Sequence, residues 1–200
     1  MLFDDLQVMG AAFVPYLASL VPHLKEVIAE SEIVYGDDKE DEEDEDIDED
    51  DDDDDGGIRV NAQDGFVNTR RAALTALGSL AEYTKEQFFP YLQEIMATIL
   101  EEPTGIIWSL VDTIRSEALS VLQNFVACAC IAEGLVASPP KGQLIALSPT
   151  VTEVSRVSMK ACVEAMEKDS DRSSVASACD SVTGILDKIG ALIYLCWFGI

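Results

Sequence analysis

The sequence repeats part of itself, and this repetition limits the folds that the chain can adopt. A pattern of aromatic, proline and aliphatic residues occurs twice at an offset of 75 residues: Phe13, Pro15, Tyr16, Leu17 and Leu20 correspond to Phe88, Pro90, Tyr91, Leu92 and Ile95. A second match has an offset of 45 residues: Ala73, Leu74 and Leu77 correspond to Ala118, Leu119 and Leu122. A fixed period of this kind indicates stacked structural units that pack on their neighbours.

Apolar side chains recur every three or four residues along most of the chain, which is the spacing of one face of an α-helix. Helices are predicted over residues 13–30, 68–84 with Asn68 or Thr69 as the N-cap, 88–102, about 106–137, 149–168, and onward from Asp171. The stretch that ends at Asn68 is predicted to be a flexible return from the acidic run that precedes it. Almost no segment has the alternating pattern of a strand.

The repeat length points to a particular class of helical protein. When the acidic insertion and its flanks, roughly 30 residues, are subtracted from the longer offset, about 40 to 45 residues remain, the length of a HEAT or armadillo repeat. We therefore predict an all-α HEAT/armadillo-type helical-repeat solenoid segment with a disordered acidic insertion. The predicted units are a partial repeat at 1–35, the acidic loop at 36–65, HEAT repeats at 66–104 and 105–170, and a partial repeat at 171–200. The apolar ending "GALIYLCWFGI" lacks a polar tail and is expected to be a truncated or altered end.

The run from Asp37 to Asp55 is acidic at every position except Lys39 and Ile47. Its seventeen acids and one lysine give it a net charge of −16, out of −25 for the whole chain. Such a segment stays solvated and disordered, because packing it would bring like charges together with no partners. A dense carboxylate array also captures cationic partners, although a purely solubilising loop is the alternative. The predicted binding residues are Asp41, Glu42, Glu43, Asp44, Glu45, Asp46, Asp48, Glu49, Asp50, Asp51, Asp52, Asp53, Asp54 and Asp55.

Several functional classes lack their sequence signals. The single histidine, His23, falls on a polar helix face, and no phosphate loop or nucleophile elbow occurs, so no enzyme activity and no cofactor are expected. The five cysteines form no C-x-x-C pair, so neither a metal site nor a disulfide framework is predicted. The net charge of −25 disfavours nucleic-acid binding. No stretch is expected to span a membrane, and Trp108 is either a surface anchor or a residue packed under the next repeat.

Two longer stretches carry a resemblance to a known family. "FVPYLASLVPHLKEVI" at 13–28 and "FVNTRRAALTALGSLAEYTKEQFFPYLQEIM" at 66–96 flank the acidic run. An "FxPY" helix, an acidic stretch, a "V-x-T" segment, an "A-x-x-A-L-G" helix and a second "PY" helix follow one another in this order. This order resembles that of the importin-beta (karyopherin-beta) nuclear transport receptors, closest to the importin-four branch and next to importin-five. Because family members are several times longer, the chain resembles an internal fragment.

The resemblance implies a function in nuclear import. It implies a receptor found in the cytoplasm and the nucleus that binds basic cargo, such as histones or ribosomal proteins, and releases it to Ran-GTP, with nucleoporin contacts in the full-length parent. Cargo would bind the concave face that the second helices form, where Glu94, Glu101, Glu102, Glu153 and Glu164 are further candidates. The alternatives are a passive HEAT scaffold, an acidic chaperone for basic proteins that needs no Ran, and a fragment that is inactive and self-associates.

Overall fold

The computed structural model describes residues 10–30, 56–102, 104–135 and 146–190, and gives only the backbone for Ala11 and residues 56–64. Within these ranges every regular element is an α-helix or a 3-10 helix, which confirms the predicted all-α class for this part of the chain. The acidic run and the apolar end at 191–200 lie outside the described residues.

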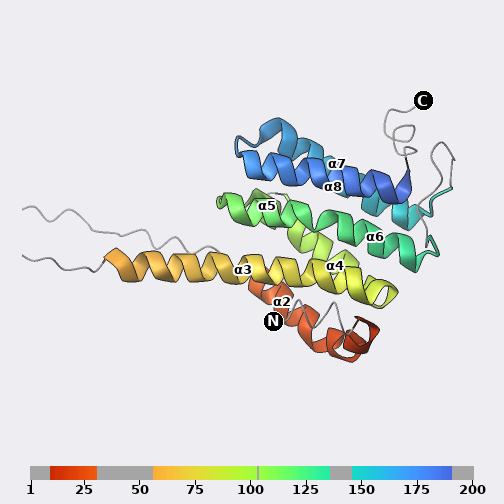
Figure 1. The fold of residues 1–200 in the computed structure, drawn as a ribbon, viewed down its shortest axis with the longest axis horizontal. Helices are drawn as coiled ribbons and strands as arrows, with labels where there is room; N and C mark the ends of the chain where they lie inside the picture. Colours follow the sequence, from red (N-terminus) through yellow and green to blue (C-terminus); the bar gives the residue numbers. More distant parts are fainter. Residues whose placement is uncertain (1–9, 31–55, 103, 136–145, 191–200) are drawn as a thin grey trace, which may run out of the picture.

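Figure 1 shows the order of the helices along the chain. Their bounds are η1 (Gly10–Tyr16), α2 (Leu17–Ala29), α3 (Gly56–Thr84), η2 (Lys85–Gln87), α4 (Phe89–Leu100), η3 (Ile106–Trp108), α5 (Asp112–Ser120), α6 (Leu122–Ala132), α7 (Pro149–Lys168) and α8 (Arg172–Ile189). The predicted helices at 13–30, 88–102, 149–168 and after Asp171 are confirmed.

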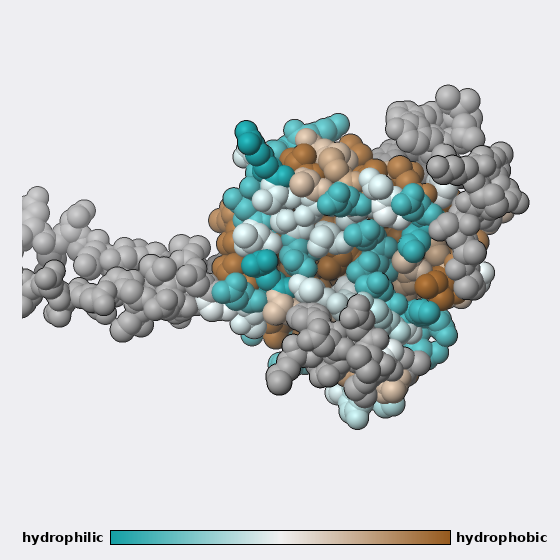
Figure 2. Space-filling model, viewed as in Figure 1, coloured by the Kyte–Doolittle hydropathy of each residue, from teal (hydrophilic) through white to brown (hydrophobic). Residues whose placement is uncertain are grey.

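Three long helical elements lie side by side and run in the same direction: α3, then α5 with α6, then α8 (Figure 1). The intervening helices return the chain, with α4 packing on α2 and α6, and α7 packing on α6 and α8. Figure 2 shows one face of this row, with apolar surface at the left edge of the helical body, beside the start of α5. The arrangement is a stack of helix pairs in which each long helix contacts its neighbours in the row.

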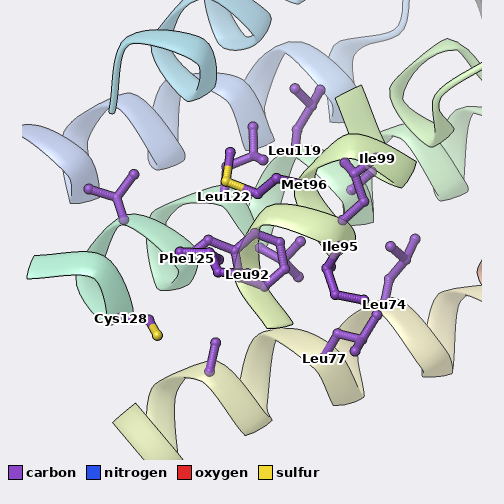
Figure 3. Packing of buried hydrophobic residues seen from close by; sticks show 14 of the residues in the cluster. Leu74, Leu77, Leu92, Ile95, Met96, Ile99, Leu119, Leu122, Phe125 and Cys128 are labelled. Atoms are coloured by element: carbon purple, nitrogen blue, oxygen red, sulfur yellow. The ribbon is translucent and has the colours of Figure 1, made fainter. Parts of the chain in front are cut away.

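The core is centred on α5 and α6. Ile114, Leu122 and Phe125 are fully buried, and side chains of α3 and α4 converge on Leu122 and Phe125 (Figure 3). The ring of Phe125 stacks on that of Phe88, with centroids 6.1 Å apart and planes within 6°. Because each such side chain contributes roughly 1.5–3 kcal/mol when it is fully buried, these two helices contribute a large part of the apolar stabilisation.

The segment Asp112–Ala132, which contains α5 and α6, is also long and apolar enough to cross a membrane. No segment of this kind was predicted from the sequence. In the structure 56% of it is buried inside the protein, and core helices of soluble proteins pass the same test of length and hydropathy. Its packing between α3, α7 and α8 accounts for its apolar character.

Residues that match in the sequence make matching contacts. The rings of Phe13 and Tyr16 are 5.4 Å apart and tilted by 51°, and those of Phe88 and Tyr91 are 6.2 Å apart and tilted by 53°. Each repeat thus places a buried phenylalanine beneath a more exposed tyrosine. Tyr16 is 53% exposed, although it shares the helical spacing of the buried Phe13 and Leu17.

The predicted start of the second helix is wrong. The helix α3 begins at Gly56 rather than after Asn68, and the Thr69 hydroxyl donates to the Gly65 carbonyl 2.8 Å away instead of capping a helix. No proline interrupts this stretch. Once α3 has nucleated, each added residue gains one hydrogen bond, which favours extension of the helix back to Gly56.

The predicted single helix at about 106–137 is divided. The short turn η3 is followed by Ser109 in an extended conformation, and α5 begins only at Asp112. Val121 separates α5 from α6, which ends at Ala132. The Ser109 hydroxyl accepts a hydrogen bond from the Val111 amide at 3.2 Å, an alternative to helical pairing that favours the break.

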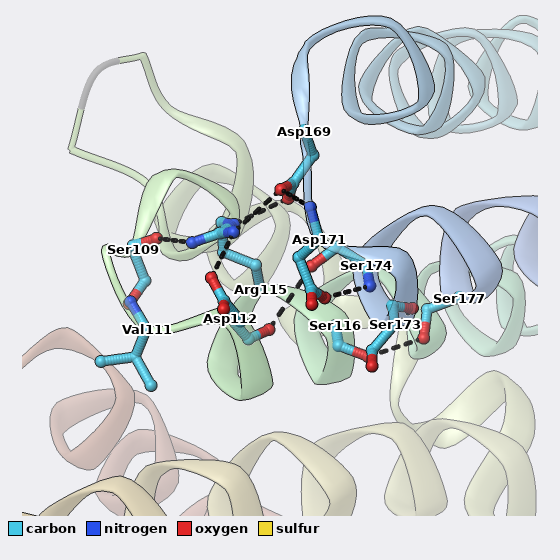
Figure 4. Close-up of polar contacts among 10 residues, drawn as sticks. All are labelled: Ser109, Val111, Asp112, Arg115, Ser116, Asp169, Asp171, Ser173, Ser174 and Ser177. Atoms are coloured by element: carbon cyan, nitrogen blue, oxygen red, sulfur yellow. Dashed lines mark hydrogen bonds and ion pairs between the residues drawn. The ribbon is translucent and has the colours of Figure 1, made fainter.

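A polar network joins the start of α5 to the turn between α7 and α8 (Figure 4). The Arg115 guanidinium donates to both carboxylate oxygens of Asp169 at 2.8 and 2.9 Å, to Asp112 at 2.6 Å and to the Ser109 carbonyl at 2.8 Å. The Asp171 carboxylate caps α8 by accepting from the Ser174 amide at 2.8 Å. The hydrogen bond from Arg115 lowers the pKa of Asp169 below its ordinary value.

Replacing Asp169 with asparagine should therefore destabilise the fold in a pH-dependent way. Because the folded-state pKa is depressed, the carboxylate stabilises the fold above its unfolded pKa of about 3.9, and this contribution is lost as the pH falls through the lower folded value. Urea unfolding at pH 7 should show a loss of about 1–3 kcal/mol for Asp169→Asn. The difference in unfolding free energy between this variant and the parent should become smaller below about pH 4. The control is Asp180→Asn, at an exposed site of α8. A difference in unfolding free energy between Asp169→Asn and the parent that does not change with pH would contradict the ionic network.

Two glycines of α3 should respond in opposite directions to alanine. A methyl group at Gly78 would lie 2.7 Å from Val121 Cγ1, so Gly78→Ala should cost about 1–3 kcal/mol through overpacking against α6. A methyl group at Gly65 would meet nothing within 4 Å, so Gly65→Ala should stabilise by about 0.5–1 kcal/mol through helix propensity. Thermal unfolding of both variants tests this, and a destabilised Gly65→Ala would mean that α3 does not extend to this residue.

Candidate functional site

The five glutamates predicted outside the acidic run do not form one surface. Three are paired with basic residues of the chain itself: Glu94 with Lys25, Glu153 with Arg156 at 2.6 Å, and Glu164 with Lys160 at 3.6 Å and Lys168 at 3.9 Å. Their charges are therefore largely neutralised within the fold. The fourteen predicted residues between Asp41 and Asp55 lie outside the described part of the chain.

Glu101 and Glu102 differ from the other three. Both are exposed at the end of α4, and no basic side chain of the described residues lies within ion-pair distance of either. These two carboxylates are the part of the predicted acidic set that remains available to an external cation.

Glu101 lines an open groove with a volume of about 470 Å³. The groove lies where α2 and α4 end, beside α3 and the segment that precedes α5. We call it the α2–α4 groove, and its lining residues are Ala29, Glu30, Arg70, Thr98, Glu101, Thr104, Gly105, Ile106, Trp108, Ser109 and Leu110. Glu30 is also the last described residue before the segment that contains the acidic run.

The polar part of the groove carries negative charge. Glu30 and Glu101 are the C-caps of α2 and α4, and both are exposed. The last carbonyls of a helix have no intrahelical partners and carry a partial negative charge, so two helix ends add to the two carboxylates. The cation in the wall, Arg70, is 5% exposed and donates to the Ile28 carbonyl at 2.8 and 3.2 Å.

The other part of the groove is apolar. Leu110 is 82% exposed and lies two residues before the start of α5. The ring of Trp108 packs against the core, and Lys168 Nζ lies 5.5 Å from its centroid. Both alternatives for Trp108 are thus partly realised, since its ring packs on the core while it also lines the groove.

The remaining candidate chemistry is structural. Among the described residues no three metal-ligating side chains lie together. Burial raises the pKa of Cys128 and Cys162 to about 12 and that of Cys130 to about 11, so these thiols remain protonated at neutral pH. These three cysteines are core residues, whereas Cys179 is exposed and Cys196 lies outside the described residues. His23 is exposed, as predicted.

Comparison with known proteins adds no family to this picture. No family model matches the chain, and no functionally characterised protein matches it significantly. The candidate site therefore depends on the geometry of the α2–α4 groove and on the charge of the chain.

Proposed function

We propose that the chain is a segment of a HEAT-type nuclear import receptor that binds a basic cargo protein, of histone-like or ribosomal-protein-like chemistry. The observation that carries this proposal is the repetition of contacts along the stack. Parallel long helices joined by return helices are typical of solenoids built from two-helix repeats. The Phe13–Tyr16 and Phe88–Tyr91 pairs, at the offset found in the sequence, have nearly the same geometry.

The charge of the chain supports the choice of a basic cargo. The acidic run carries −16 of the total charge of −25, and the glutamates at the α2–α4 groove add carboxylates that no described basic residue pairs. Such a surface accelerates the capture of lysine- and arginine-rich segments. By resemblance to the importin-beta receptors, Ran-GTP would release the cargo in the nucleus, and the complete receptor would contact nucleoporins.

The test is the binding of a lysine-rich histone-tail peptide to the full chain. In the variant, the acidic residues between Asp41 and Asp55 are replaced by asparagine and glutamine, so that the length of the segment is unchanged. The variant should bind at least about tenfold more weakly, a loss of about 1.4 kcal/mol. Its affinity should also depend less on salt between 50 and 200 mM, because fewer charges are left to screen.

Ran-GTP provides the second arm of the experiment. Displacement of the peptide by Ran-GTP supports a transport receptor, whereas binding that Ran-GTP leaves unchanged favours an acidic chaperone or a scaffold. Equal affinity of the parent and the neutral variant would contradict cargo binding by the acidic run and leave it as a solubilising loop.

A further inference from the structure

The α2–α4 groove has the two kinds of surface that a long cationic side chain needs. We propose that it binds one lysine or arginine side chain of an extended basic partner segment, with the charged end at Glu30 and Glu101 and the aliphatic stem against Trp108 and Leu110. This inference rests on the proposed function, and it assigns to the folded part of the chain a binding site separate from the acidic run.

The first argument is charge complementarity. Glu30 and Glu101 cap the two helices that end at the groove, and neither forms an ion pair with a described basic residue. The guanidinium of Arg70 is directed to the Ile28 carbonyl at the end of α2. Because Arg70 is buried and bonded to the end of α2, an incoming cation meets the two exposed carboxylates and the C-terminus of α4, which favour a cation over an anion.

The second argument is the apolar wall. Lysine and arginine carry three or four methylene groups, which pack on apolar surface while the charged end stays polar. Leu110 offers such a surface, since 82% of it is exposed. The Trp108 ring already attracts one cation, Lys168 at 5.5 Å, which agrees with the preference of tryptophan for cationic neighbours. A volume of about 470 Å³ accommodates a side chain together with part of its backbone.

Other occupants fit less well. Too few ligands converge for a metal ion, since no group of three candidate ligands occurs among the described residues. The phosphates of a nucleic acid would face Glu30 and Glu101, while Arg70, the basic residue of the described lining, is only 5% exposed. A purely apolar segment would leave both carboxylates in contact with nonpolar groups, at a cost in desolvation.

The experiment measures binding of a fluorescein-labelled arginine-rich histone-tail peptide to the full chain by anisotropy. The double variant Glu30→Gln and Glu101→Gln keeps the shape of the groove and removes its charge. The matched control, Glu133→Gln with Glu167→Gln, changes the net charge equally at two exposed sites that do not line the groove. Leu110→Ser tests the apolar wall at a position that the fold does not need, because it is largely exposed.

We expect the groove double variant to weaken binding about fivefold to tenfold and Leu110→Ser about threefold, with the control within about twofold of the parent. The indole N–H resonance of Trp108, distinguished from that of Trp197 with a Trp197→Phe chain, should shift on peptide addition in the parent and not in the groove double variant. Equal affinities for the groove and control variants, or an indole resonance that does not move in the parent, would overturn the groove assignment. If the groove assignment failed in this way but the acidic-run variant still lost affinity, the proposed function would be retained without the groove site. A peptide that does not bind the parent chain would overturn both the groove assignment and the proposed function.

Discussion

The burial of α5 and α6 among the surrounding helices is the interaction on which the rest of the structure depends. Leu122 and Phe125 face side chains from α3 and α4, and α7 and α8 pack against the same helices from the next part of the stack. Apolar burial of this extent supplies the free energy that offsets the ordering of the seven described α-helices. Without this central element neither the row of parallel helices nor the groove at their edge would have a fixed position.

Two arginines at corresponding sequence positions join a long helix to other segments of the chain. Arg70 of α3 donates to the Ile28 carbonyl, and Arg115 of α5 donates to the Ser109 carbonyl and to Asp169. In both cases the guanidinium of a long helix donates to a backbone carbonyl of a preceding segment. Because guanidinium presents several donors in a fixed plane, one residue can join a helix to two neighbours, which lysine cannot do as well. The position of the α2–α4 groove follows from this joint, since Arg70 holds the end of α2 beside α3.

Hydrophobic periodicity in the sequence was sufficient to predict α4, α7 and α8, because each buries one continuous stripe and begins at a recognisable proline or cap. Hydrophobic periodicity failed to predict the start of α3, because no apolar spacing marks its first residue and helix propagation extends the helix to Gly56. It also failed within 106–137, where a serine side chain competes for backbone hydrogen bonds in a segment that is apolar almost throughout.

The candidate site was predicted only in part. Glu101 and Trp108 were identified from their chemistry, whereas Glu30 and Leu110 were not, since nothing in the local sequence shows that they share a groove with residues about 70 positions away. Glu94, Glu153 and Glu164, also predicted to bind cargo, form ion pairs with lysines or arginines of the chain. The net charge of the chain indicated a basic partner, but the tertiary packing determines which carboxylates are available to bind that partner.

The central claim is that α5 and α6 form the interior of a stacked helical body, and native-state hydrogen exchange of the full chain in detergent-free buffer tests it most directly. We predict that the amides between Ile114 and Ala129 exchange most slowly, through global unfolding, while those of α3 before Gly65 exchange rapidly. Exchange between Ile114 and Ala129 as rapid as at the start of α3, or a chain that is folded only in detergent, would contradict the account.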